Sequence, residues 1–210
     1  MPWVLLLALC ACLSGCSPMP PFVVYCDAYS RAAADPILAQ WQTLAGNRPL
    51  EVQYSPIPFA LQKQRMGGQV DIIIGPYAPS LEAQLQHLPA DWRLWRMLPD
   101  TLRTAVRSDT TRKPKDTLTV GMAEARHPLR YWQDSQLRLQ PPAAPWQTTY
   151  EIVPALLPGY LQRGLVDRAA LPAGLVPAAC GKLPGGLPFS HRIWLSPRAQ
   201  AWLQAVHAPK

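Results

Sequence analysis

Residues 68–75, Gly-Gln-Val-Asp-Ile-Ile-Ile-Gly, decide the fold, because a continuous apolar run between glycines is typical of a strand buried on both faces. Two short runs precede it, Phe-Val-Val-Tyr at residues 22–25 and Leu-Glu-Val-Gln-Tyr at residues 50–54. Apolar side chains at helical spacing predict a helix after residues 26–30 and another over residues 59–66. The order strand, helix, strand, helix, strand predicts a parallel sheet with right-handed crossovers.

Beyond Asp91 the order of predicted strands and helices is less regular, but the two kinds of element continue to alternate. A helix is predicted at residues 81–88, and the later predicted strands are at 103–107, 118–121, 167–171 and 193–195. The later predicted helices cover residues 128–133, 150–163 and 198–206. The last of them follows Ser196-Pro197, a capping residue with proline at the first helical position.

The N-terminus carries the most specific local pattern. Val4 to Leu13 is an apolar run of ten residues without charge, which is too short to span a bilayer and is typical of a signal peptide. It ends in Leu-Ser-Gly-Cys, which resembles the bacterial lipobox and implies that Cys16 is lipidated. An ordinary cleaved signal with a chance cysteine is the alternative, and the missing Lys or Arg at residues 1–3 departs from the usual signal.

Composition excludes several classes of protein. The 210 residues are 49% hydrophobic and carry a net charge of +7, which allows a real core and suits an anionic partner or a membrane surface. Twenty-five prolines argue against long helical bundles. The sequence holds no common hydrolase, zinc-protease or phosphate-loop motif, so we expect no enzyme. Aromatic residues interleaved with basic stripes are also missing, so we expect no nucleic-acid partner.

Two cysteines lie outside the predicted signal and its lipobox. Cys26 and Cys180 are 154 positions apart, and an exported protein would permit a disulfide between them. Two small buried thiols are the alternative. A cysteine-bound metal needs more ligands than this pair supplies.

Together these motifs resemble the type II periplasmic solute-binding proteins. The lipobox, the Val-Val-Tyr-Cys-Asp-Ala-Tyr-Ser stretch and the Gly68–Gly75 strand are similar to the opening of that family, and Ser196 to Val206 to its last helix. The molybdate-binding branch is the most similar and the iron-binding branch the next. The resemblance implies an α/β fold of two lobes, each a mainly parallel sheet flanked by helices. It implies a signal at 1–15, a tether at 16–21, lobe 1 at 22–102 with 190–210 returning to it, and lobe 2 at 103–189.

The resemblance also implies a ligand site in three loops between the lobes. Its candidate residues are Asp27, Tyr29, Ser30, Arg31, Ser55, Glu124 and Arg126. Arginine and hydroxyl groups suit an oxyanion. A metal ion bound by Asp27, Tyr29, Glu124 and His127 is the alternative. Ile57 and Pro58 stand where the family has small hydroxyl residues, which removes donors from the second loop.

The resemblance finally implies a role. We expect a lipid-anchored, monomeric protein of the cell envelope that captures an oxyanion of the molybdate type for an ABC permease, without a cofactor. The alternatives are a degenerate binding protein that acts as an envelope sensor or assembly partner, and an iron or metal binder.

Overall fold

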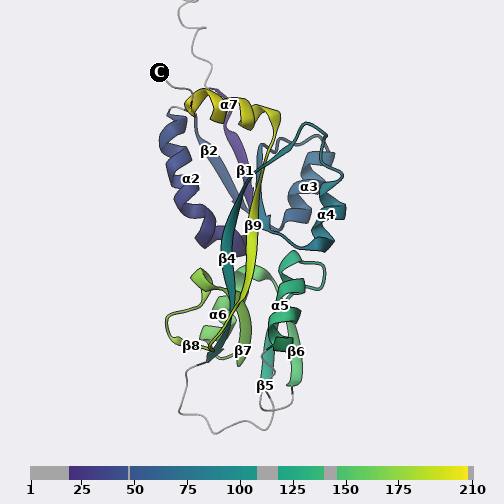
Figure 1. Ribbon diagram of the computed structural model, residues 1–210, viewed down its shortest axis with the longest axis vertical. Helices are drawn as coiled ribbons and strands as arrows, with labels where there is room; N and C mark the ends of the chain where they lie inside the picture. Colours follow the sequence, from purple (N-terminus) through teal and green to yellow (C-terminus); the bar gives the residue numbers. More distant parts are fainter. Residues whose placement is uncertain (1–18, 47, 108–117, 140–145, 208–210) are drawn as a thin grey trace, which may run out of the picture.

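The computed structural model describes residues 19–46, 48–107, 118–139 and 146–207. Two lobes are stacked along the long axis of the molecule (Figure 1). The predicted signal peptide and Cys16 lie outside the described residues. None of the described helices combines the length and the apolar character needed to cross a bilayer.

Lobe 1 is built on the predicted strand–helix repeat. Its strands β1, β2 and β3 cover Phe22–Cys26, Leu50–Tyr54 and Ile72–Pro76. Strand β1 pairs in parallel with β2 and β3, which confirms the predicted parallel arrangement. The helices of this lobe are α2 (Arg31–Ala45), α3 (Ile57–Arg65), α4 (Pro79–Leu85) and α7 (Pro197–His207), and a short 3-10 turn, η1 (Ala28–Ser30), leads into α2.

Lobe 2 repeats the same plan with fewer helices among the described residues. Strands β5 (Leu118–Ala123), β6 (Trp146–Ile152) and β7 (Arg168–Pro172) are parallel, and β8 (Cys180–Lys182) pairs with β4. The helices are α5 (Pro128–Leu139) and α6 (Leu157–Gln162), with the 3-10 turns η2 (Pro154–Leu156) and η3 (Ala173–Leu175). The region predicted as a helix over 150–163 is instead a strand, a turn and a short helix.

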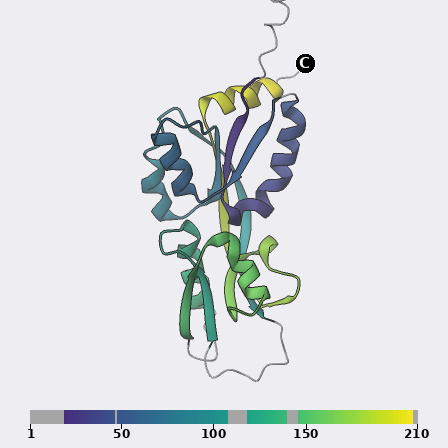
Figure 2. The same ribbon diagram turned by 180° about the vertical axis from the view of Figure 1, so that it is seen from behind.

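Two long strands join the lobes. Strand β4 (Arg93–Arg107) and strand β9 (Leu187–Leu195) are antiparallel partners that run from one lobe into the other (Figures 1 and 2). The sheet order is β2-β1-β3-β9-β4-β7-β5-β6, so one mixed sheet passes through both lobes. The expected α/β fold of two lobes is confirmed, and the strands β1–β3 and β5–β7 are parallel within their lobes. The sheet as a whole is mixed, because the crossover strands are antiparallel to β3 and β7.

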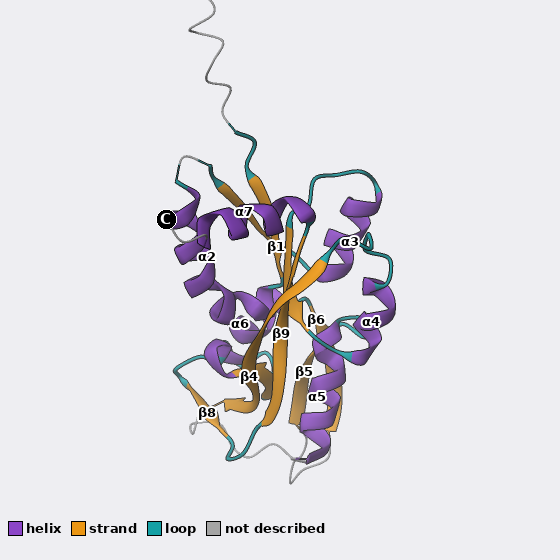
Figure 3. Ribbon diagram, turned by 45° about the horizontal axis from the view of Figure 1, so that its top comes forward, coloured by secondary structure: helices purple, strands orange, loops and turns teal. Residues whose placement is uncertain are grey.

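Helices cover both faces of the lobe 1 sheet (Figure 3). Helices α2 and α7 pack on one face against a cluster that includes Val24, Ile74 and Trp41. Helices α3 and α4 pack on the other face around Ile73 and Trp194. Successive side chains of a strand point to opposite faces, so the continuous apolar run of β3 supplies both cores.

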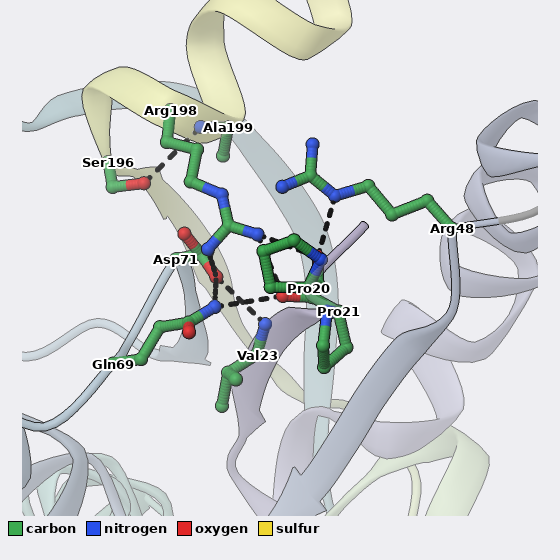
Figure 4. A network of polar contacts seen from close by, with 9 residues as sticks. All are labelled: Pro20, Pro21, Val23, Arg48, Gln69, Asp71, Ser196, Arg198 and Ala199. Atoms are coloured by element: carbon green, nitrogen blue, oxygen red, sulfur yellow. Dashed lines mark hydrogen bonds and ion pairs between the residues drawn. The ribbon is translucent and has the colours of Figure 1, made fainter. Parts of the chain in front are cut away.

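The aspartate of the 68–75 motif joins three elements of lobe 1. The buried Asp71 carboxylate accepts hydrogen bonds from the Val23 backbone N–H (2.9 Å) and the Gln69 amide (2.8 Å), and it pairs with Arg198 of α7 (Figure 4). Arg198 also donates to the carbonyl groups of Pro20 and Pro21, so the start of β1 is fixed against α7. Asp71 is therefore a structural residue.

Candidate functional site

The junction between the lobes gathers the loops that follow two parallel strands. Strand β1 ends at Cys26 and continues into η1, whereas β5 ends at Ala123 and continues through residues 124–127 into α5. In open α/β sheets the carboxyl ends of parallel strands are where ligands bind. The candidate site is therefore built from these two loops and the start of α3.

A buried hydrogen bond joins the two loops across the junction. Asp27 Oδ2 lies 2.8 Å from His127 Nε2, and both side chains are almost completely buried. The Leu129 N–H donates to His127 Nδ1 (3.1 Å), so the hydrogen-bond network assigns the ring proton to Nε2, which donates to Asp27. The His127 ring therefore caps the start of α5 through Nδ1 and bonds lobe 1 through Nε2. The other Asp27 oxygen accepts the Tyr29 N–H at 2.9 Å.

A second chain of polar contacts ties the same loop to the crossover strands. Ser30 Oγ lies 2.8 Å from His191 Nδ1, and His191 Nε2 lies 2.9 Å from Asp100 Oδ2. His191 belongs to β9 and Asp100 to β4. Ser30 and His191 are completely buried, so this chain of serine, histidine and aspartate anchors the loop and offers no accessible nucleophile.

Tyr29 stands between these two anchors and reaches into the other lobe. It is completely buried and belongs to the lobe 2 core, with Met122, Leu129 and Leu157 among its members. Its ring meets the His127 ring edge-on, with the centroids 5.4 Å apart. Burial, and secondarily the Asp27 carboxylate, raise the pKa of the Tyr29 phenol above the range of ordinary tyrosines.

A pocket of about 290 Å³ opens beside the Asp27–His127 contact. Lobe 2 supplies Glu124, Arg126 and His127 to its lining, and lobe 1 supplies an apolar wall and one amide from the start of α3, namely Pro56, Pro58, Phe59 and Gln62. Glu124 and Arg126 are exposed and Phe59 is half exposed. The pocket therefore offers both signs of charge and an apolar surface to a molecule that touches both lobes.

The structure does not bring all the predicted ligand residues together. Asp27, Tyr29 and Ser30 lie in the junction but are bonded or packed within the protein, and Glu124 and Arg126 line the pocket. Arg31 lies on the surface of α2, where it pairs with Asp35 (3.4 Å) and stacks on Tyr54. Ser55 is half-buried, and its backbone N–H donates to the Cys26 carbonyl.

The expected disulfide is wrong in this structure. Cys26 is a buried free thiol of β1 in lobe 1, and Cys180 is a buried free thiol of β8 in lobe 2. Burial raises the pKa of both thiols, which lowers their reactivity. The alternative interpretation is therefore the right one, since Cys26 and Cys180 are two small buried thiols.

The alternative metal site is not assembled. Within the described ranges, no cluster of three or more histidine, cysteine, aspartate or glutamate side chains could hold a metal ion. Asp27 and His127, two of the four proposed ligands, bond to each other.

Sequence reasoning missed the partners of the junction residues. His191 and Asp100 lie 161 and 70 positions from Ser30, and no local pattern connects residues so far apart. Gln133 was also missed. It is buried in α5, where it accepts the Ala123 N–H (2.7 Å) and donates to the Ala170 carbonyl (2.8 Å), and so fixes α5 to β5 and β7. Its only sequence signal is an uncharged polar residue on the apolar side of a predicted helix.

The two lobes, the crossover strands and the loops at the junction define the type II periplasmic-binding-protein fold. No protein-family model matches the sequence, and no curated protein is similar to it. The fold is therefore established by comparison with solved structures.

The solved structures that resemble the chain include regulatory domains of LysR-type regulators. The reduced OxyR regulatory domain of Pseudomonas aeruginosa has a TM-score of 0.60 at 15% identity, over 91% of this chain and 98% of that one. Full-length HypT of Salmonella typhimurium, a hypochlorite-specific LysR-type transcriptional regulator, has a TM-score of 0.65 at 14% identity, over 98% and 75%. The CcmR regulatory domain of Synechocystis, in complex with 2-PG, has a TM-score of 0.62 at 10% identity, over 90% and 97%.

These neighbours correct the functional expectations drawn from the sequence. They are regulatory domains and transcriptional regulators, which contradicts the expected capture of an oxyanion or metal ion for an ABC permease. The same finding overturns the molybdate-type role, the lipid anchor, the envelope location, and the expectation of a monomer without a nucleic-acid partner. The shared fold explains the error, because sequence pattern reflects the fold and both kinds of protein use it.

Proposed function

We propose that this chain is the sensing domain of a regulatory protein, and that it binds a small effector between its two lobes. The comparisons support the proposal through the regulatory domains of similar fold, one of which was solved with a bound small molecule, 2-PG. We further propose that the domain binds its effector without converting it. The Ser30–His191–Asp100 chain supports this view, since its serine and histidine are completely buried.

The pocket between α3 and the β5–α5 loop carries the proposal. Its lining comes from both lobes, so an effector in it contacts both of them at once. His127 forms part of its wall and also bonds Asp27 of lobe 1. A ligand that contacts His127 differently in two lobe arrangements shifts the equilibrium between them by the difference in its binding free energy.

The lining indicates the chemistry of the effector. Arg126 suits a carboxylate or phosphate group, Glu124 suits a cationic or hydroxyl group, and Phe59 with two prolines suits an apolar part. We infer a small molecule that carries at least one charged group and a compact apolar part.

A ligand screen by thermal shift tests the proposal. Organic acids, amino acids and sugar phosphates are added at millimolar concentration, and a true effector at 100 times its Kd adds about 2.7 kcal/mol, or roughly 5–10 °C in Tm for a domain of this size. Arg126→Ala should reduce that shift by more than half. The matched control is Arg31→Ala, another exposed arginine outside the pocket, which should keep the shift.

Two results would count against the proposed function. One is a screen in which no compound of these classes stabilises the wild-type protein. The other is a compound that stabilises the wild type, Arg126→Ala and Arg31→Ala equally, since its site would then lie outside the pocket.

A further inference from the structure

Part of the junction is filled by a side chain of the protein. Tyr29 belongs by sequence to the first loop of lobe 1, yet its side chain is part of the lobe 2 core and is completely buried. The pocket of the proposed effector lies beside this position, and Tyr29 is not part of its lining.

The Tyr29 ring lies in the region of the fold where a ligand would bind. Tyr29 follows the carboxyl end of β1 and contacts His127, which follows the carboxyl end of β5. Ligands of open α/β sheets bind at such ends. The ring lies edge-on to the His127 imidazole, a geometry that attracts aromatic groups.

The residues on either side hold the ring in place. Asp27, two residues before it, bonds His127 of lobe 2, and Ser30, directly after it, bonds His191 of the crossover strand β9. Separating the lobes would expose the whole aromatic ring and break the Asp27–His127 hydrogen bond. Burial of an aromatic side chain is among the larger contributions a single residue makes to a contact between two bodies.

We propose that Tyr29 is an internal ligand, which holds the lobes closed by filling an aromatic site that lobe 2 presents to the junction. The closed arrangement is then the resting state of the domain and needs no bound molecule. The site accommodates an aromatic ring, so removal of the Tyr29 side chain leaves a cavity that a free aromatic molecule can occupy. This inference stands independently of the proposed effector pocket, which has a different lining.

Chemical complementation tests the inference. In Tyr29→Ala we expect a Tm at least 10 °C below that of the wild type and a larger radius of gyration in small-angle X-ray scattering. Addition of millimolar p-cresol, which is the tyrosine side chain as a free molecule, should raise the Tm of Tyr29→Ala and restore the wild-type radius of gyration. The wild type should respond to p-cresol in neither measurement.

Tyr25→Ala is the matched control, because Tyr25 is equally buried but packs in the lobe 1 core on the side of α3. It should lower the Tm without changing the radius of gyration. Tyr29→Leu, which keeps apolar volume in the site, replaces Tyr29→Ala if the alanine variant does not fold, and the same increase in radius is expected.

The inference is overturned by either of two results. A Tyr29 variant that folds with the wild-type radius of gyration would show that the ring does not hold the lobes together. If p-cresol fails to stabilise Tyr29→Ala, or stabilises Tyr25→Ala to the same extent, lobe 2 presents no specific site for an aromatic ring.

Discussion

The Asp27 carboxylate has two tasks at the junction. One oxygen accepts the Tyr29 N–H and shapes the first loop, and the other accepts the His127 ring N–H from lobe 2. Both side chains are buried, so loss of either partner leaves a polar group without compensation in an environment of low polarity. The contact is therefore expected to contribute far more than a surface ion pair.

A double-mutant cycle measures that contribution. Asp27→Asn and His127→Gln are each expected to lower the free energy of unfolding by about 2–4 kcal/mol, with a coupling of about 1.5–3 kcal/mol in urea unfolding. Arg31→Ala with Asp35→Ala is the control cycle, because that pair is exposed on one helix, and its coupling should be below about 0.5 kcal/mol. Equal coupling in the two cycles would contradict the role of Asp27.

The buried Tyr29 phenol predicts a loss of stability at high pH. Its pKa in the folded state is raised, so its contribution is complete below the ordinary tyrosine pKa of about 10 and is lost as the pH rises above that value. The unfolded chain then releases a proton that the folded chain keeps. Urea unfolding between pH 9 and 11 should show a slope in the wild type that is steeper by up to about 1.4 kcal/mol per pH unit than in Tyr29→Phe. Identical slopes would refute the prediction.

For single residues, the sequence indicates which residue types lie in the junction more readily than it indicates which residues they contact. The first loop stands out because Asp27, Tyr29 and Ser30 follow a buried strand, and the structure places all three in the junction. Their contacts with His127 and His191 depend on the packing of elements 100 or more residues apart. Nothing in the local sequence around His127 indicates its contacts, and only the tertiary structure shows that it caps α5 and binds Asp27.

Among the elements, β1, β3 and α7 share one aspartate. Asp71 accepts three hydrogen bonds through a single carboxylate oxygen, and its backbone N–H and carbonyl bond Val23 and Ser196. The carboxylate therefore compensates the Arg198 charge and fixes the ends of three elements at one point (Figure 4).

Substitution of Asp71 should therefore destabilise lobe 1. Asp71→Asn keeps the shape but loses the charge, and its amide N–H groups can face the donors of Val23 and Gln69, so we expect a loss of about 2–3 kcal/mol in urea unfolding. The control is Asp91→Asn, an exposed aspartate of the same lobe, which should change the stability by less than about 0.5 kcal/mol. A loss of similar size in both variants would contradict the account.

Element prediction succeeds where the apolar period is strong and fails where other constraints act. The strands β1, β2 and β3 lie close to the predicted ranges, because buried strands need continuous or alternating apolar residues. The predicted helix over 150–163 fails because Thr148, Thr149 and Tyr150 favour a strand and Pro154 cannot donate a backbone hydrogen bond. The 15 residues of β4 were largely missed, since residues 93–97 are exposed and show no alternation.

The whole molecule is a pair of lobes on two shared strands, closed by side chains of its own first loop. The fold class could be predicted from the sequence because the strand–helix order reflects the layers of the sheet. The function could not be predicted in the same way, because transport proteins and regulatory domains share that order of strands and helices and differ in the partners that contact the lobes. Additional contacts support the closed arrangement. Trp132 of α5 donates to the Tyr77 carbonyl of lobe 1. Gly174 of η3 lies so close to α2 that a Cβ on it would come within 2.8 Å of the Ala32 Cβ, so only glycine allows this approach.

The distance between the lobes in solution shows whether Asp27 and Tyr29 hold the ligand-free domain closed. Spin labels at Arg65→Cys on α3 and Arg138→Cys on α5 report it by double electron–electron resonance, because both positions are exposed and the two cysteines within the described residues, Cys26 and Cys180, are buried. Cys10, Cys12 and Cys16 are replaced by serine so that they take up no label. We expect one narrow distance distribution in the ligand-free protein and a broader, longer one when Asp27→Asn and Tyr29→Ala are combined. A broad or two-peaked distribution in the ligand-free protein with native Asp27 and Tyr29 would contradict this expectation.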